Sequence, residues 1–185
     1  MTRLPLRYDA AGPDEARRVH ALYLATPAYF ETLSIPLPSV EEVRTDLATA
    51  AQDPRRRTEL VVLGGDESAF PAAAQDVAYL DVTLDYLGPG DATVNLLLVR
   101  GDRHRQGIGG TVASDLQRRL RGRCRRLLAS VYGRNPAARR FWTSQGFHFA
   151  IDAAPVLEWY AKRLPTEDPA DPSAELAVLS GDAPG

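Results

Sequence analysis

A glycine-rich stretch at residues 104–110, HRQGIGG, has the composition of a turn that binds an anion through its main chain. An apolar strand pattern precedes it and a helical pattern follows. Several backbone N–H groups would therefore point at one spot, with the helix dipole behind them. Gly107 and Gly109 lack a β-carbon, which lets a ligand approach the main chain closely. This chemistry suits phosphate, although a plain tight turn before a helix has the same signature.

Two common phosphate-binding patterns do not fit this stretch. No Gly-Lys-Ser or Gly-Lys-Thr follows the glycines, which excludes a P-loop. A dinucleotide-binding fold carries its glycines after the first strand of a repeated strand–helix unit, whereas these come after the fourth expected strand.

A second segment, NPAARRFWTSQGF at residues 135–147, has the pattern of a short helix. Asn135 suits its N-cap, and Gly146 suits its C-terminal end. Taken alone, Phe141 and Trp142 are ordinary core candidates, and the segment carries no functional signal.

Hydrophobic periodicity supplies the elements that would hold both segments in place. Ser39 followed by Glu42 is a capping box at the start of a helix. Residues 93–100 are apolar on both sides apart from Asn95, as in a central strand covered on both faces. The patterns predict strands at 4–9, 59–63, 77–86, 93–100, 127–132, 147–151 and 156–163, and helices at 13–24, 40–52, 108–120 and 136–145.

Together the two segments resemble the GNAT superfamily of N-acetyltransferases. Its first motif is a strand ending in valine and then a Q/R-x-x-G-x-G/A loop, and here Val99 lies eight residues before Gly107. Its second motif is N-x-x-A-x-x-F-Y-x-x-x-G-F. The residues that match it here are Asn135, Ala138, Phe141, Gly146 and Phe147.

The resemblance covers about residues 3–164, is strongest over 93–148 and includes two departures. His104 stands where the family prefers glutamine or arginine, which matters little because main-chain N–H groups hold the phosphate. Trp142 replaces the tyrosine of F-Y, as in some related bacterial branches. An indole N–H cannot protonate a thiolate at ordinary pH, so the usual general acid is missing.

The resemblance implies an α/β (α+β) architecture, the GNAT fold. This fold has a central mixed, mostly antiparallel seven-stranded sheet, splayed between its fourth and fifth strands, with helices on both faces. The expected organisation is one acetyltransferase domain at residues 1–164 and an acidic C-terminal tail at 165–185.

The resemblance also implies acetyl-CoA as co-substrate. Main-chain donors of the loop would wrap its pyrophosphate, the edge of the fourth strand would pair with its pantetheine amides, and an N–H near Val99 would polarise the acetyl carbonyl. Asn135 would contact the pantetheine arm or fix the splayed fifth strand. The expected cofactor residues are Leu97, Leu98, Val99, Arg105, Gln106, Gly107, Ile108, Gly109, Gly110, Thr111, Asn135 and Arg139, with Arg103, Arg134 and Arg140 as further candidates for the 3′-phosphate.

Acid–base residues are less clearly marked. Alternation places Asp81 and Asp85 on the polar face of the strand at 77–86, where they are candidates for the general base or else ordinary exposed acids. Tyr132, at the end of the fifth strand, is a candidate general acid. The loop at residues 27–36, with Tyr29 and Phe30, falls where relatives build the lid over the acceptor.

Charge is divided along the chain. Residues 100–140 carry twelve arginines and two aspartates, a net +10, while residues 1–99 have a net charge of −7. The basic block matches an anionic ligand, and the acidic half predicts a cationic amine acceptor, on a small molecule or a peptide. The acidic remainder argues against nucleic-acid binding, and the arginines at 118–126 are also explained as a solvated helix face and end.

Composition limits the remaining possibilities. The three histidines lie far apart without ligand spacing, so no metal site is expected. The single cysteine permits no intramolecular disulfide and fits a cytoplasmic protein, and no segment is apolar enough to span a membrane. The sequence allows a homodimer without requiring one.

Two functions compete at this point. The first is an N-acetyltransferase in which a primary amine attacks acetyl-CoA directly within a ternary complex. The second is a module of the same fold that binds CoA esters with little or no catalysis, because the tyrosine of the second motif is missing. The glycine loop serves both functions, and turnover with a panel of amines separates them.

Overall fold

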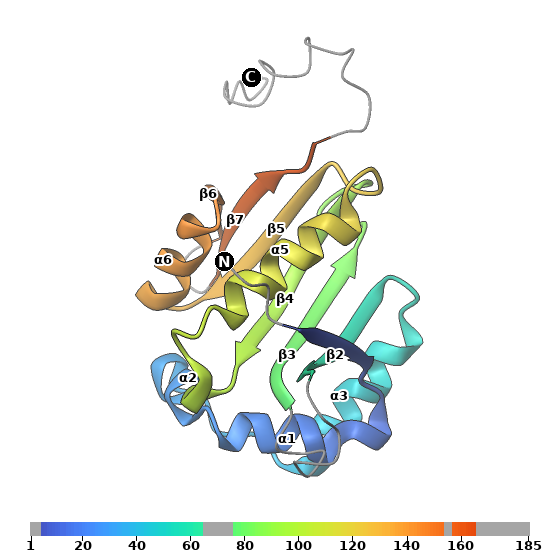
Figure 1. The fold of residues 1–185 in the computed structure, drawn as a ribbon, viewed down its shortest axis with the longest axis vertical. Helices are drawn as coiled ribbons and strands as arrows, with labels where there is room; N and C mark the ends of the chain where they lie inside the picture. The colour runs from blue at the N-terminus through green and yellow to red at the C-terminus, as the bar shows by residue number, and fades with distance from the viewer. Residues whose placement is uncertain (1–4, 65–75, 154–156, 166–185) are drawn as a thin grey trace.

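The computed structural model describes residues 5–64, 76–153 and 157–165 (Figure 1). Its centre is a seven-stranded sheet in the order β1-β2-β3-β4-β5-β7-β6. The pair β4–β5 is parallel and the other pairs are antiparallel, which confirms the predicted mixed sheet. The strands are β1 (Leu6–Ala10), β2 (Arg56–Leu63), β3 (Asp76–Leu84), β4 (Asp91–Val99), β5 (Arg126–Tyr132), β6 (His148–Ala153) and β7 (Leu157–Arg163).

Helices cover both faces of the sheet, as predicted. On one face, Leu80 of β3 packs in a core with residues of α5 and α6. On the other, its neighbour Tyr79 packs in a core with residues of α1 and α3. Figure 1 shows α5 lying across the near face of the sheet. The α-helices are α1 (Ala16–Leu24), α2 (Pro27–Leu33), α3 (Val40–Gln52), α5 (Ile108–Leu120) and α6 (Pro136–Ser144), with short 3₁₀ turns η1 (Pro13–Glu15) and η2 (Gly101–Arg103).

Local signals placed most helix starts correctly, but they missed α2. The capping box at α3 is confirmed: the Ser39 side chain accepts from the Glu42 N–H, and the Glu42 carboxylate accepts from the Ser39 N–H at 2.7 Å. Residues 27–36 were predicted as a loop, yet Pro27–Leu33 form a helix. Proline suits the first helical turn because its missing N–H has no helical partner there. Phe30 supplies the buried contact that holds α2 on the domain.

The sheet divides between β4 and β5, which is the feature that creates the site. Their pairing runs only from Asp91–Arg126 to Val94–Ala129. Beyond that point the C-terminal halves of the two strands are not paired with each other, so one edge of each faces the gap. The predicted splay between the fourth and fifth strands is therefore confirmed.

A β-bulge and one hydroxyl group mark the point of division. Asp81 pairs with Leu96 and Val82 with Val94, so Asn95 is the extra residue of β4. Successive carbonyls normally alternate sides of a strand, but the Ser130 hydroxyl donates to both the Val94 and Asn95 carbonyls, each at 3.1 Å. Ser130 thus satisfies two carbonyls at the position where β5 leaves β4.

We expect Ser130→Ala to lower the free energy of unfolding by about 1–2 kcal/mol, because two partly buried carbonyls lose their donor. Urea unfolding measures this change. The matched control is Ser144→Ala, which removes an exposed hydroxyl that donates to the Phe141 carbonyl at 2.7 Å. It should change stability by no more than about 0.5 kcal/mol. Equal losses in both variants would contradict the role given to Ser130.

One expectation concerns residues that lie almost entirely outside the described ranges. The predicted acidic tail at 165–185 is described only at Pro165, so the domain boundary at residue 164 stays a prediction. Among the described residues, no helix has the length and apolarity needed to cross a membrane.

Candidate functional site

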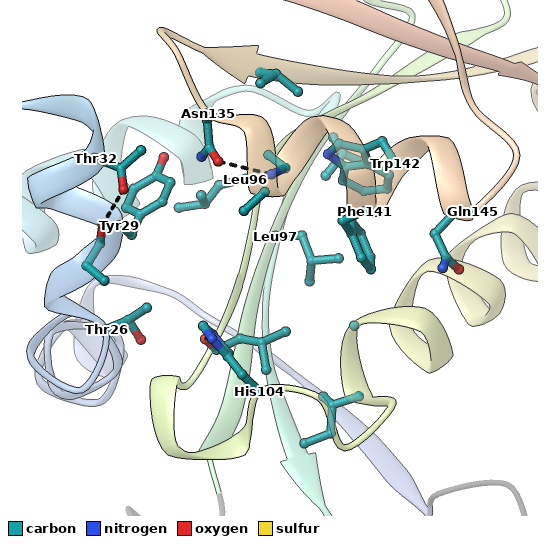
Figure 2. Close-up of a pocket in the computed structure, with 18 of the residues that line it drawn as sticks. Thr26, Tyr29, Thr32, Leu96, Leu97, His104, Asn135, Phe141, Trp142 and Gln145 are labelled. Carbon is teal, nitrogen blue, oxygen red and sulfur yellow. Dashed lines mark hydrogen bonds between the residues drawn. The ribbon is translucent and has the colours of Figure 1, made fainter.

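A cavity of about 730 Å³ opens where β4 and β5 separate. Its walls come from α2, the unpaired half of β4, the loop before α5, the end of β5, and α6. Figure 2 shows Tyr29 and Thr32 from α2, His104 from the loop, and Asn135 and Phe141 from α6 around the same space. Elements that are far apart in the sequence therefore meet at one site.

The glycine loop forms one wall of this cavity. Gly107 is the N-cap of α5 with φ of 81°, and no side chain caps the helix there. The N–H groups of the first helical turn have no partner within the helix, so they remain available to an anion. Arg105 also has a positive φ, 61°, which is uncommon for a residue with a side chain. The loop thus has the backbone form of an anion cradle.

Gly109 is required by packing as much as by ligand access. A β-carbon at this position would lie 3.1 Å from the Phe141 ring and 3.5 Å from the Val99 side chain. The missing side chain therefore lets α5 and α6 approach each other beside the β4 edge. The two segments singled out in the sequence are in direct contact at this point.

The edge of β4 is the floor of the cavity, and two side chains already bind part of it. Ser130 occupies the Val94 and Asn95 carbonyls, and the His104 ring lies with Nε2 2.8 Å from the Val99 carbonyl. A carbonyl only accepts, so His104 Nε2 carries the hydrogen of this bond. His104 thereby fixes the end of β4, a role that its side chain performs without touching the glycine cradle.

On α6, the expected cap is present and the replaced tyrosine is buried. The Asn135 side chain accepts from the Ala138 N–H at 3.0 Å, and Asn135 also lines the cavity (Figure 2). Trp142 is 5% exposed, and its ring centre lies 4.8 Å from those of both Phe141 and Phe147. Trp142 therefore packs the base of α6 and presents one side to the cavity.

Two tyrosines, Tyr29 and Tyr132, line the cavity. Their phenol groups carry the same O–H donor as the tyrosine that Trp142 replaces. Tyr132, at the end of β5, is 49% exposed. Tyr29 comes from α2, and burial raises its pKa above the ordinary value, with a smaller contribution from the neighbouring Tyr132. Tyr29 thus keeps its proton at neutral pH and can donate it.

Eight of the expected cofactor residues line the cavity and four do not. Leu98 is buried in the core beneath α1 and α3, since it alternates away from the gap. The Gln106 side chain donates to the Asp102 carbonyl, and that of Thr111 donates to the Gly107 carbonyl. The lining residues are Leu97, Val99, Arg105, Gly107, Ile108, Gly109, Gly110 and Asn135.

Arg139 is the fourth residue outside the cavity, and its guanidinium is engaged elsewhere. Its Nη2 pairs with the Glu158 carboxylate on β7, which holds α6 against the sheet. Of the other arginines proposed for the 3′-phosphate, Arg103 lines the cavity, whereas Arg134 and Arg140 are exposed outside it.

The two aspartates expected to act as general base do not line the cavity. Asp81 is 4% exposed, pairs with Arg56 at 2.6 Å, and accepts from the bulge residue Asn95 at 2.9 Å. Asp85 lies in the turn at the opposite end of β3, where it accepts from the Gly90 N–H at 2.7 Å. Asp85 lies beside Asp91, which is three residues, or about 10 Å along β4, from Val94, the nearest lining residue of that strand. The structure therefore gives both carboxylates structural roles and corrects the sequence interpretation.

The basic block at residues 100–140 was predicted to match an anionic ligand, but most of its arginines lie outside the cavity. Half of its twelve arginines lie between the last turn of α5 and the start of β5, about 20 Å along the helix from the glycine cradle. Several are neutralised within the domain: Arg118 by Asp115, Arg119 by Glu59 and Arg126 by Asp91. Only Arg103 and Arg105 of the block line the cavity, so the net +10 does not describe the site.

Several lining residues were missed by sequence reasoning, and Ser130 and Thr32 are two of them. Ser130 is an isolated serine in an apolar strand, and only the position of the bulge opposite it reveals its function. Thr32 lines the cavity because residues 27–33 form a helix, and the proline before an aromatic pair was the signal that could have indicated it. Among the described residues, no cluster of His, Cys, Asp or Glu could hold a metal ion.

The acetyltransferase (GNAT) family model matches residues 32–147. A solved acetyltransferase from Thermus thermophilus is 37% identical, with 89% of this chain and all of that chain covered, and a TM-score of 0.80. No curated protein matches the chain.

Two more distant structures share the fold. A ribosomal L7/L12 alpha-N-protein acetyltransferase in complex with coenzyme A is 17% identical, with 86% of this chain and 94% of that chain covered, and a TM-score of 0.63. The ribosomal-protein-S18-alanine N-acetyltransferase from Escherichia coli is 15% identical, with 89% and 97% covered, and a TM-score of 0.61.

Proposed function

This chain belongs to the acetyltransferase (GNAT) family, and on that premise we propose that it transfers the acetyl group of acetyl-CoA to a primary amine of a small molecule or peptide. The amine attacks directly within a ternary complex. The observation that carries the proposal is the cavity between β4 and β5, because it joins an anion cradle to an unpaired strand edge. The single cysteine fits a cytoplasmic setting.

The residues present fit the acetyl donor. The first turn of α5 offers uncapped N–H groups to a pyrophosphate, and Arg103 and Arg105 add positive charge beside it. The edge of β4 between the bulge and Val99 offers main-chain groups to the amides of an extended pantetheine arm. The bound donor supplies an activated thioester carbonyl. In this proposal a main-chain N–H near Val99 polarises that carbonyl in the manner of an oxyanion hole.

Proton transfer falls to side chains other than those of the usual motif. We propose Tyr132 as the group that protonates the departing thiolate, since Trp142 cannot do so and Tyr132 lines the same cavity. Tyr29 is the alternative donor, because it lines the same cavity, and its raised pKa makes it a weaker acid than an ordinary tyrosine. The acceptor amine loses its proton to water or to a base that it meets on entry, since neither Asp81 nor Asp85 reaches the cavity.

The second candidate function, a CoA-ester-binding module without catalysis, is favoured only by the presence of Trp142. A panel of primary amines separates the two. With acetyl-CoA and the native protein, we expect release of free thiol that depends on one class of amine and gives one acetylated product per thiol by mass spectrometry. Binding of acetyl-CoA without thiol release above the rate of hydrolysis, across the whole panel, would support the binding module.

A further inference from the structure

The charges around the cavity do not suit a polycationic acceptor. Arg103 and Arg105 are its charged lining residues, and none of the described residues that line it is Asp or Glu. A second or third ammonium group on the acceptor would meet like charge and find no carboxylate to pair with. The acidic first half of the chain does not alter this, because its carboxylates lie elsewhere.

Three carboxylates that neighbour lining residues are already paired, and the exposed Glu31 of α2 is not among the lining residues. Asp81 lies opposite Leu96 in the sheet and binds Arg56 at 2.6 Å. Glu158 lies opposite Val131 and pairs with Arg139, and Asp102 pairs with Arg100 at 2.9 Å. Releasing Glu158 or Asp102 to serve as a base would break its pair with an arginine, and releasing Asp81 would break its hydrogen bonds with Arg56 and Asn95.

Without a carboxylate base, the basicity of the acceptor decides how much of it can attack. A lysine-type amine has a pKa of about 10.4 and a peptide α-amine one of about 7.7–8.0. At pH 7.5 about 0.1% of the first and about 30% of the second are neutral, a ratio of roughly 200. The imidazole of His104 does not remove this difference, because an imidazole is too weak a base to deprotonate a lysine-type ammonium.

The wall that α2 contributes is neutral as well. Ala28, Tyr29, Thr32 and Leu33 line the cavity there, and none carries a charge at neutral pH. Such a surface accommodates an uncharged amide and a small apolar group beside the amine. It offers no partner for a long side chain that ends in an ammonium group.

We infer that the acceptor is an α-amine next to an uncharged amide, as at a peptide N-terminus or in an amino-acid amide, in preference to a lysine side chain or a polyamine. This inference rests on the proposed acetyl transfer and narrows its substrate. It replaces the cationic acceptor that the charge division of the sequence predicted.

The test uses two peptides of one sequence that contains a single lysine. One has a free N-terminus and an acetylated lysine side chain, and the other has an acetylated N-terminus and a free lysine. At pH 7.5 we expect kcat/KM for the α-amine to exceed that for the lysine by about 100-fold or more. For the α-amine, kcat/KM should rise with pH with an apparent pKa near 8 and level off above about pH 9. An amino-acid amide and a polyamine are measured in parallel, and the amide shows whether a small molecule suffices.

The outcomes separate this inference from the proposed function. If the lysine peptide or the polyamine is acetylated as well as the α-amine at neutral pH, the inference is overturned while acetyl transfer stands. If no amine releases thiol although CoA binds, the proposed function fails and the inference fails with it. Preference for the α-amine, together with a pH profile whose apparent pKa is that of the α-amine, supports both.

A pair of variants tests the cause of the preference. Thr32→Glu adds a carboxylate to the α2 wall, and Thr32→Gln adds a neutral side chain of the same shape. The Glu variant should reduce the preference for the α-amine over the lysine at least 10-fold relative to the Gln variant. Equal preferences in the two variants would contradict the idea that the missing carboxylate at this wall sets the acceptor class.

Discussion

Gly110→Asp is expected to weaken CoA binding by about 100-fold or more while leaving the fold intact. Gly110 lies in the first turn of α5 and lines the cavity. A carboxylate there would face the pyrophosphate across a few ångströms, and at about 4 Å such repulsion reaches about 4 kcal/mol at an effective dielectric constant near 20. A loss of about 2.8 kcal/mol is already 100-fold in Kd.

The substitution should not destabilise the protein, which makes the result interpretable. A β-carbon at Gly110 would meet the Gln145 side chain at 3.6 Å, an ordinary contact. Replacing a helical glycine and placing an acid near the helix N-terminus are both mildly stabilising. This position is therefore a cleaner test than Gly109, where a β-carbon would press on Phe141.

Gly110→Asn is the matched control, because it has the same shape without the charge. Isothermal titration with CoA gives both Kd values, and thermal unfolding without ligand confirms that the two variants fold equally well. We expect the Asn variant to bind within about 10-fold of the native protein. If the Asp and Asn variants bind CoA with the same affinity, the pyrophosphate does not lie at this helix end.

The second large effect is expected at Tyr132. Removing the hydroxyl in Tyr132→Phe should lower kcat by about 100-fold, the usual size of a general-acid contribution, with little change in KM for acetyl-CoA. The thiolate would then depart without a proton donor, while the ring and its contacts remain. Steady-state kinetics at saturating acetyl-CoA, with the best amine of the panel, measures this loss.

Two other aromatic variants show whether the effect is specific. Trp142→Phe changes a buried ring in the same cavity and should keep most of kcat, since an indole cannot act as the acid. Tyr29→Phe removes the other phenol. A loss at Tyr29→Phe with none at Tyr132→Phe would transfer the role to α2, and normal kcat in both would exclude a phenol as the proton donor.

The sequence identified the glycine cradle and α6 because their signals are local. Gly107 begins α5 and Asn135 caps α6, and both signals depend only on residues close by in the sequence. Gly109 contacts Phe141 at a sequence spacing that is typical of the family. Backbone geometry of this kind is encoded by residue type, and the structure shows each of these residues at the cavity. The mixed seven-stranded sheet and its splay followed from the same resemblance, whereas the strand order comes from the structure.

The acid–base residues could not be obtained in this way. Alternation correctly placed Asp81 and Leu80 on opposite faces of the sheet. It cannot show which elements cover the face that carries Asp81. In the structure α1 and α3 cover it, and Arg56 and the bulge residue Asn95 bind the carboxylate. Burying a carboxylate requires such partners, so an aspartate in a strand is either a free acid or a structural anchor depending on its neighbours.

The charge division failed for a related reason. Sums along the chain treat residues 100–140 as one patch, yet six of the twelve arginines lie between the last turn of α5 and the start of β5, about 20 Å along α5 from the glycine loop. Three of these six pair with Asp115, Glu59 and Asp91, two of which come from strands distant in sequence.

The sequence by itself thus determined the family, the mixed sheet and the position of the glycine loop, because these depend on backbone conformation and short-range spacing. The tertiary structure alone decided which side chains face the gap between β4 and β5. Tyr29, Thr32 and Ser130 reach it, whereas Asp81 and Asp85 do not. The physical reason is that a charge or hydroxyl acquires its function from the partners that folding brings within hydrogen-bonding distance, and those partners come from other elements of the chain.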